Sequence, residues 1–183
     1  MPNTPFIPEF ITVHLGPPDS NAENVTLPFS DYIANVASSE IYPTWPESAI
    51  RANIYAQISF ALNRIYTEYY RSRGYDFDIT NSIAIDQSFV NGRDIFSNVN
   101  QIVLEIFDNY IVRQGNVEPL FATYCDGEEV ICDGLSQWGS VSLAELTLLF
   151  RSSAPLAAAE CLSTATSLCA SPSPQKAESA IGR

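Results

Sequence analysis

The alternation of apolar and polar positions divides most of the chain into short strands and longer helices. Over residues 31–39, apolar side chains recur every three or four positions, which is the spacing of one helix face, and Ser30 precedes them as a candidate cap. A longer apolar stripe begins after Pro46 and continues to about Arg73, where Gly74 can end a helix. The stripe therefore predicts a long, mostly buried central helix.

Runs rich in β-branched residues predict short strands around these helices. The predicted strands cover residues 10–15, 25–27, 76–79, 84–89, 110–113 and 120–124, the last two as a pair. Two further helices are predicted, one from Asp94 to about Leu104 and one over residues 142–146. The pattern predicts an α+β fold, a single domain with a long central helix and short antiparallel strands.

The composition changes near residue 152, after which the chain is rich in Ala, Ser, Thr and Pro and has no aromatic residue. We therefore divide the chain into an N-terminal strand and linker (1–24), a domain (25–150) and a tail (151–183). We expect no stable packing in the tail, because it offers little apolar surface to bury. The tail is either natively disordered or the product of a changed reading frame.

The net charge restricts the classes of partner. The 183 residues carry a formal net charge of −12 at pH 7, which argues against nucleic acid and anionic membranes as partners. No apolar run approaches the roughly 18 residues of a membrane span, and residues 1–16 lack the basic and apolar regions of a secretory signal. An uncharged glycan is compatible with this charge, since sugars bind by stacking and hydrogen bonds.

Cys125 and Cys132 lie in a Gly- and Asp-rich stretch, YCDGEEVICDG. They could form a disulfide hairpin, form half of a metal site, or pack as small side chains in a strand pair. The single histidine, His14, is distant in sequence. A zinc site made of cysteines alone would need the two cysteines of the tail, so we expect no cofactor.

Residues 38–52, SSEIYPTWPESAIRA, hold the strongest candidate for catalysis. Glu40 ends a predicted helix close to Tyr42 and Trp45, and a carboxyl desolvated by aromatic rings gains the raised pKa that a general acid needs. The alternative is a solvated glutamate at a helix end, with both aromatic side chains in the core. Thr44 and Glu47 have the spacing of a capping box, so Glu47 is interpreted as structural.

Three segments resemble, in the same order, the stage II sporulation protein D (amidase enhancer) family. Residues 27–62, LPFSDYIANVASSEIYPTWPESAIRANIYAQISFAL, are similar to its pattern "lpleeYv-gVvasEmp-sWp-eALkAQAvaARTya". Residues 86–92, DQSFVNG, are similar to "dQvY-G", and residues 134–140, GLSQWGS, to "GmSQwGa". The resemblance covers about residues 25–146.

The resemblance implies a lytic transglycosylase of peptidoglycan glycan strands, with Glu40 as its single essential acid. Such an enzyme protonates the glycosidic oxygen while the C6 hydroxyl of the muramyl residue attacks the anomeric carbon, which leaves a 1,6-anhydro end. The candidate substrate-binding residues are Tyr42, Trp45, Gln87, Ser136, Gln137 and Trp138. The alternative for Gln137 and Trp138 is that they only close the fold around a Gly-rich turn.

The chain departs from the family pattern at two places. The Arg of "ART" falls on Ile58, which removes any charge-assisted contact by that side chain. The "GHG" that relatives carry before the third motif is replaced by Cys132-Asp133-Gly134, so a zinc would have only Cys125 and Cys132 as candidate ligands.

The resemblance also implies partners and a location. We expect glycan strands and a wall amidase as partners, and a place in the cell wall or spore. Two rival hypotheses remain: a non-catalytic wall-binding or amidase-enhancing module, and an inactive product whose C-terminal portion is lost.

Overall fold

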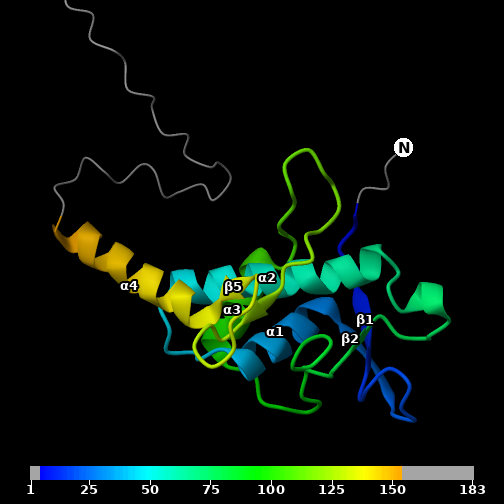
Figure 1. The fold of residues 1–183 in the computed structure, drawn as a ribbon. Coiled ribbons are helices and arrows are strands. Elements are labelled where there is room, and N and C mark those ends of the chain that lie inside the picture. Colours follow the sequence, from blue (N-terminus) through cyan, green and yellow to red (C-terminus); the bar gives the residue numbers. More distant parts are fainter. Residues whose placement is uncertain (1–4, 154–183) are drawn as a thin grey trace, which may run out of the picture. The chain divides into compact units, whose positions relative to one another are not determined.

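The computed structural model describes residues 5–153 of the chain. The described residues up to Leu148 form one compact unit of α-helices and short strands (Figure 1). The predicted α+β class is confirmed. The predicted tail lies almost entirely outside the described residues.

A three-stranded sheet lies at one end of this unit, in the order β2-β1-β3. Strand β1 (Phe10–His14) is antiparallel to β2 (Asn24–Pro28) and parallel to β3 (Ile79–Thr80). Two more strands, β4 (Tyr124–Cys125) and β5 (Leu135–Ser136), also pair in parallel. The expectation of antiparallel strands is therefore wrong for two of the three pairs. Strand β3 follows two helices, and such crossovers return the chain in the parallel direction.

The helices supply most of the core. Helix α1 (Phe29–Glu40) packs against α2 (Glu47–Tyr66) and α3 (Ser97–Ile106), and β1 contributes Ile11 and Val13 to the same core. Helix α4 is the last described element and comprises Gln137–Ser153. The predicted central helix is confirmed in α2, whose side chains are buried without interruption from Ala56 to Arg64.

The ends of α2 differ from the prediction. Pro46 occupies its N-cap position without a side-chain hydrogen bond, and Glu47 instead pairs with Arg51 one turn further on, so there is no capping box. The helix ends at Tyr66 because Glu68 adopts a positive φ of 49°. Gly74, with a φ of 90°, ends the separate 3₁₀ turn η1 (Arg71–Arg73). At about 1.5 Å per residue, α2 is about 30 Å long rather than the ~40 Å that the stripe predicts.

Helix α1 begins one residue before the predicted cap, since Pro28 takes the N-cap position and Ser30 lies inside the helix.

The buried polar residues of α2 explain how one helix holds the surrounding segments in place. Each of them bonds a different segment, and buried polar groups of this kind need such partners. They are Asn53 with Ser140, Gln57 with Glu40, Ser59 with the amide of Ile111, Asn63 with the carbonyl of Pro119, and Arg64 with Asp86.

The segment 84–89 is not a strand, contrary to the prediction. Three of its N–H groups bond nearby backbone carbonyls, as in turns, and that of Ser88 donates to Glu40 of α1. The next residue, Val90, exchanges two hydrogen bonds with Asn35 of the same helix. The predicted pairing of 110–113 with 120–124 is reduced to one antiparallel bridge, between Val112 and Pro119.

Candidate active site

Glu40 is the last residue of α1, and its carboxylate receives hydrogen bonds from three different segments. The backbone N–H of Ser88 donates to Oε1 at 2.8 Å, and the Nε2 of Gln57 donates to Oε2 at 2.8 Å. The hydroxyl of Tyr124 forms the third hydrogen bond. The residue is half-buried. The acid is therefore held in one orientation by groups that lie far apart in sequence.

A buried hydrogen-bond network extends inward from this carboxylate. The Nε2 of Gln87 donates to the Tyr124 hydroxyl at 3.0 Å and to the carbonyl of Gln57 at 3.1 Å. The Tyr32 hydroxyl donates to Gln87 Oε1 at 2.9 Å. Gln87 was a predicted glycan contact, and the structure brings it to the site, but with no exposed surface. It orients Tyr124, which in turn bonds Glu40.

Burial and hydrogen bonding have opposite effects on the pKa of Glu40. Burial raises the pKa, while the hydrogen bonds from Ser88, Tyr124 and Gln57 lower it, and burial has the larger effect. Burial, together with the charge of Glu40, raises the pKa of Tyr124 well above its usual value, so this hydroxyl remains a donor at neutral pH. The arrangement favours a carboxyl that retains its proton to higher pH than an exposed glutamate.

The second amide atom of Gln57 is unusual. Its Oε1 is buried and accepts no hydrogen bond from any described residue. Turning the amide by 180° would place this oxygen toward Glu40, where it could accept a hydrogen bond from the protonated carboxyl. Gln57 can thus serve both protonation states of the acid.

Three aromatic side chains gather beside the Glu40 segment, and we call them the aromatic cluster: Tyr42, Trp45 and Trp138. The ring centres of Trp45 and Trp138 lie 4.9 Å apart, and Tyr42 lies 5.7 Å from Trp45 and 6.0 Å from Trp138. Tyr42 is 58% exposed and Trp138 is 36% exposed. Trp45 is half-buried against Ala49, Val141 and Ala144.

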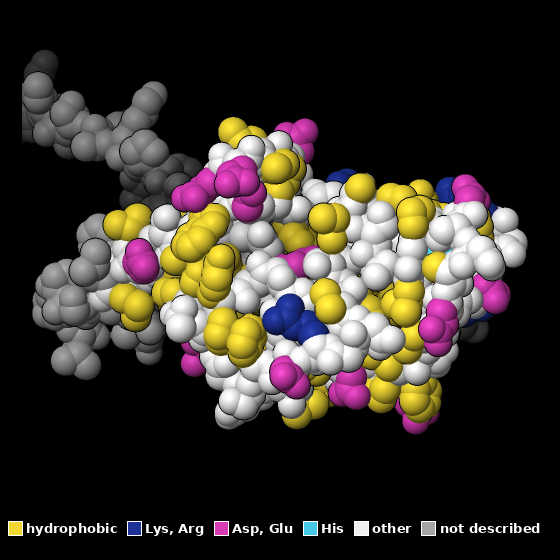
Figure 2. Space-filling model, turned by 90° about the horizontal axis from the view of Figure 1, so that it is seen from below, with side chains coloured by type: hydrophobic (Ala, Val, Ile, Leu, Met, Phe, Trp, Pro, Cys, Tyr) yellow, Lys and Arg dark blue, Asp and Glu magenta, His cyan; other side chains and the backbone are white. Residues whose placement is uncertain are grey.

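One face of the protein carries clusters of hydrophobic side chains, and an acidic side chain is recessed among them (Figure 2). Partly exposed rings can stack on a sugar face, and a recessed carboxyl can reach a glycosidic oxygen.

The Gly-rich motif at residues 134–140 stabilises the beginning of α4. Ser136 Oγ accepts a hydrogen bond from the amide of Gly139 at 2.9 Å, which caps α4, and Gln137 is buried. A Cβ at Gly127 would lie 1.9 Å from Ser136 Oγ, so glycine is required for this close approach. Of the predicted contacts in this motif, Trp138 is the one that joins the aromatic cluster.

Cys125 and Cys132 form a disulfide. Because bridged sulfurs do not ligate a metal, the two cysteines cannot be zinc ligands while the disulfide is formed, and their prediction as candidate ligands is wrong for the oxidised protein. The described residues contain no group of three His, Cys, Asp or Glu side chains that could hold a metal ion. Cys125 directly follows Tyr124 in β4, so the disulfide closes the loop that positions a partner of Glu40.

The sequence pattern did not identify Gln57, Ser88 or Tyr124 as partners of the acid. Gln57 gave one signal in the sequence, because it lies three residues after Ile54 and four before Ala61, at the spacing of the apolar stripe. Ser88 contributes its backbone N–H, which no side-chain motif can reveal.

Comparison with protein-family models, with curated proteins and with solved structures finds no match to this chain. Over the part of the chain that the structure describes, no helix combines the length and apolar character needed to cross a membrane.

Proposed function

We propose that this protein cleaves peptidoglycan glycan strands as a lytic transglycosylase, with Glu40 as its general acid. The observation that carries the proposal is the carboxyl of Glu40, whose pKa is raised by burial while three donors fix its orientation. A positioned acid that keeps its proton to higher pH than an exposed glutamate is suited to protonate a leaving group.

The reaction needs only one carboxyl. Protonated Glu40 gives its proton to the glycosidic oxygen as the bond from that oxygen to the muramyl C1 breaks. The C6 hydroxyl of the same muramyl residue then forms a bond to C1 and returns its proton to the Glu40 carboxylate. The products are a 1,6-anhydro end and a new 4-hydroxyl end, and the acid is regenerated. The hydrolytic glycosidases differ in needing a second carboxylate.

The surroundings of Glu40 supply the remaining requirements. Tyr42, Trp45 and Trp138 offer ring faces for pyranose units, and their exposure leaves them accessible. The raised pKa of the Tyr124 hydroxyl keeps it a donor to the carboxylate that forms after proton transfer. The resemblance to the stage II sporulation protein D family supplies the substrate class and agrees with the choice of acid.

The experiment is a digest of purified glycan strands by the wild type and by Glu40→Gln. Mass spectrometry distinguishes a 1,6-anhydro end from a hydrolysed end, because the anhydro product lacks one water. The proposal expects anhydro products from the wild type and none from the variant.

A binding module without catalysis is the second candidate, and one observation favours it. Three donors occupy most of the acceptor sites of the Glu40 carboxylate, as they would in a purely structural acid. In that case strands would bind to the aromatic cluster and remain uncut, and Glu40→Gln would bind them as the wild type does.

A further inference from the structure

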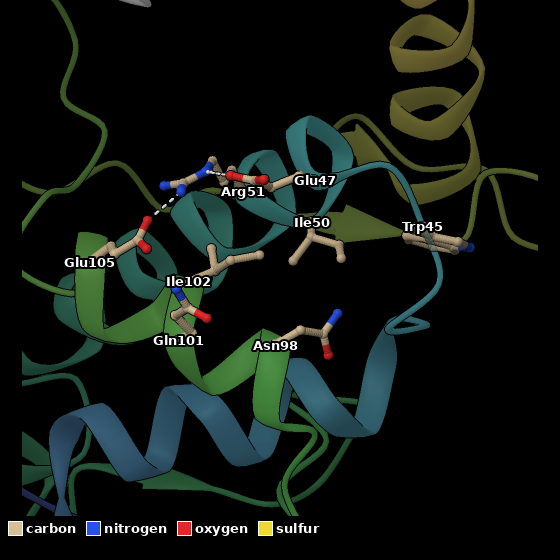
Figure 3. Close-up of a pocket in the computed structure, with 8 residues that line it drawn as sticks. All are labelled: Trp45, Glu47, Ile50, Arg51, Asn98, Gln101, Ile102 and Glu105. Carbon is tan, nitrogen blue, oxygen red and sulfur yellow. Dashed lines mark hydrogen bonds and ion pairs between the residues drawn. The ribbon is translucent and has the colours of Figure 1, made fainter.

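A pocket of about 180 Å³ lies between the beginning of α2 and the neighbouring helix α3 (Figure 3). Ile50 and Ile102 form its apolar floor, and Trp45 closes one end. This volume is below the roughly 300–1,000 Å³ of pockets for drug-sized ligands, so the pocket fits one small unit.

The polar groups of the pocket lie on two sides of this floor. Arg51 of α2 bonds Glu47 of the same helix and Glu105 of α3, and Figure 3 shows the three side chains converging above the floor. The guanidinium is thus neutralised by two carboxylates, and the triad carries one net negative charge. Such a rim disfavours phosphate, nucleotide or other anionic ligands.

On the α3 side, the amides of Asn98 and Gln101 project along the same face of the helix (Figure 3). Gln101 is exposed, and Asn98 donates to the carbonyl of Pro43 at 2.7 Å. Side-chain amides can donate to and accept from a neutral polar ligand. The lining therefore combines a Trp face, an apolar floor, two amides and two carboxylates that can accept from hydroxyls.

We infer that this pocket binds an N-acetylhexosamine unit, as a subsite distinct from the Glu40 centre. The pyranose ring would lie against Trp45, the acetyl methyl would contact Ile50 and Ile102, and Gln101 would bond the acetamide group. The absence of a free cation in the described lining matches an uncharged sugar. The choice of a glycan strand as the source of the sugar rests on the proposed function.

The pocket is continuous with the candidate active site through one loop. Trp45 lines the pocket and also contacts Trp138 of the aromatic cluster. Asn98 binds the carbonyl of Pro43, which lies between Tyr42 and Trp45 in the chain. A strand that passes over Glu40 could therefore place a second sugar in the pocket without leaving the protein surface.

The test is an NMR titration of the full chain carrying Glu40→Gln with N,N′-diacetylchitobiose, followed through the indole N–H signals. The chain has two tryptophans, so Trp138→Phe assigns both signals. We expect a saturable shift of the Trp45 signal, and binding weaker by about tenfold for cellobiose, which lacks the acetamides.

Gln101→Ala should weaken chitobiose binding by about fivefold, the loss expected for one neutral hydrogen bond. Gln101→Arg, whose longer side chain reaches across the mouth of the pocket, should abolish the shift. Leu104→Ala is the matched control, because Leu104 is an exposed α3 residue outside the pocket lining. Equal affinity for cellobiose, or a shift that survives Gln101→Arg, would overturn the inference.

Binding is measured in a variant that should not cut, so this inference and the proposed function fail separately. Chitobiose binding without strand cleavage by the wild type would retain the pocket and refute the transglycosylase. Cleavage by the wild type without chitobiose binding would refute the sugar pocket and retain the transglycosylase.

Discussion

The Nε2 of Gln57 lies 2.8 Å from the Oε2 of Glu40 and donates a hydrogen bond to it from the middle of α2 to the end of α1. The opposite amide atom of Gln57 is buried and receives no bond from the described residues. The amide of Gln57 therefore donates a hydrogen bond to the carboxylate, and after a rotation of 180° it can accept one from the protonated carboxyl. This relationship makes the protonation of Glu40 dependent on a neighbour that carries no charge.

Gln57→Leu should raise the pKa of Glu40 further, because the substitution removes one of the donors that stabilise the carboxylate. A ¹³C NMR titration of the glutamate side chains measures the change directly and does not depend on activity. Ser59→Ala is the control, since Ser59 is a buried polar residue of the same helix that bonds Tyr55 and Ile111 instead. A Glu40 pKa that stays the same or falls in Gln57→Leu would contradict the network.

Glu40 should also make stability depend on pH. Because its pKa is raised in the folded state, the folded chain binds more protons than the unfolded chain at pH values between the two pKa values. The contribution of Glu40 is therefore fully present below the unfolded pKa of about 4.5 and is lost as pH rises through the folded pKa.

Urea unfolding of the wild type and of Glu40→Gln at pH 4 and pH 7 tests this sign. The stability of the wild type relative to the variant should fall over this range, by about 1.4 kcal/mol for each unit that the pKa is raised. Because the two proteins share all their other carboxyl groups, the contributions of those groups to the pH dependence cancel in the difference. A wild type that gains stability relative to the variant as pH rises would mean that the pKa of Glu40 is lowered.

The disulfide should stabilise the segment that carries Tyr124. Cys125 and Cys132 are separated by 7 positions, and closing so short a loop contributes about 2.5 kcal/mol in the chain-entropy description. Reductant should lower the free energy of unfolding of the wild type by about this amount. The variant Cys125→Ser/Cys132→Ser controls for the two other cysteines and should not respond. An equal response in both proteins would exclude this bridge as the cause.

Arg64 and Asp86 form an ion pair whose side chains are 8% and 0% exposed. Arg64→Met should cost about 3 kcal/mol of stability, because it removes the cation that neutralises the buried carboxylate and leaves only the neutral donors Tyr70 and Thr80. Arg71→Met is the matched control: its pair with Asp78 is more exposed, so its loss should cost about 1 kcal/mol or less. Similar losses in the two variants, measured by thermal unfolding, would show that burial does not distinguish the pairs.

The sequence was informative where periodicity and composition determine structure. The apolar stripe located α2, and the residues around Glu40 pointed to a glutamate whose carboxyl the structure surrounds with donors. The stripe did not reveal the end of α2, because that depends on the backbone of Glu68 rather than on apolar spacing. It also placed a strand at 84–89, where the apolar side chains are real but the peptide groups bond nearby carbonyls and, at Ser88, the side chain of Glu40. Long-range pairs of this kind leave no local pattern.

Trp138→Ala should weaken strand binding, because the exposed part of its indole is then lost as a stacking surface. The rest of the ring packs against Trp45, so the variant should also lose stability, and binding is compared at a temperature at which circular dichroism shows it to be folded. Losing about 60 Å² of stacked ring face costs about 1.5 kcal/mol, or about tenfold in Kd. Leu143→Ala, at an exposed position of the same helix, is the control. Sedimentation of the full chain with purified strands measures the binding of both variants. Unchanged binding by Trp138→Ala would remove this ring from the proposed substrate surface.

The most direct test of the central claim compares three proteins on the same purified strands, with and without stem peptides: the wild type, Glu40→Gln and Glu23→Gln. Glu23 is the matched acid, because it is exposed at the surface and belongs to neither the aromatic cluster nor the pocket beside Trp45. We expect 1,6-anhydro ends from the wild type and from Glu23→Gln, and none from Glu40→Gln. Anhydro products from Glu40→Gln, or uncut strands in all three digests, would contradict the claim.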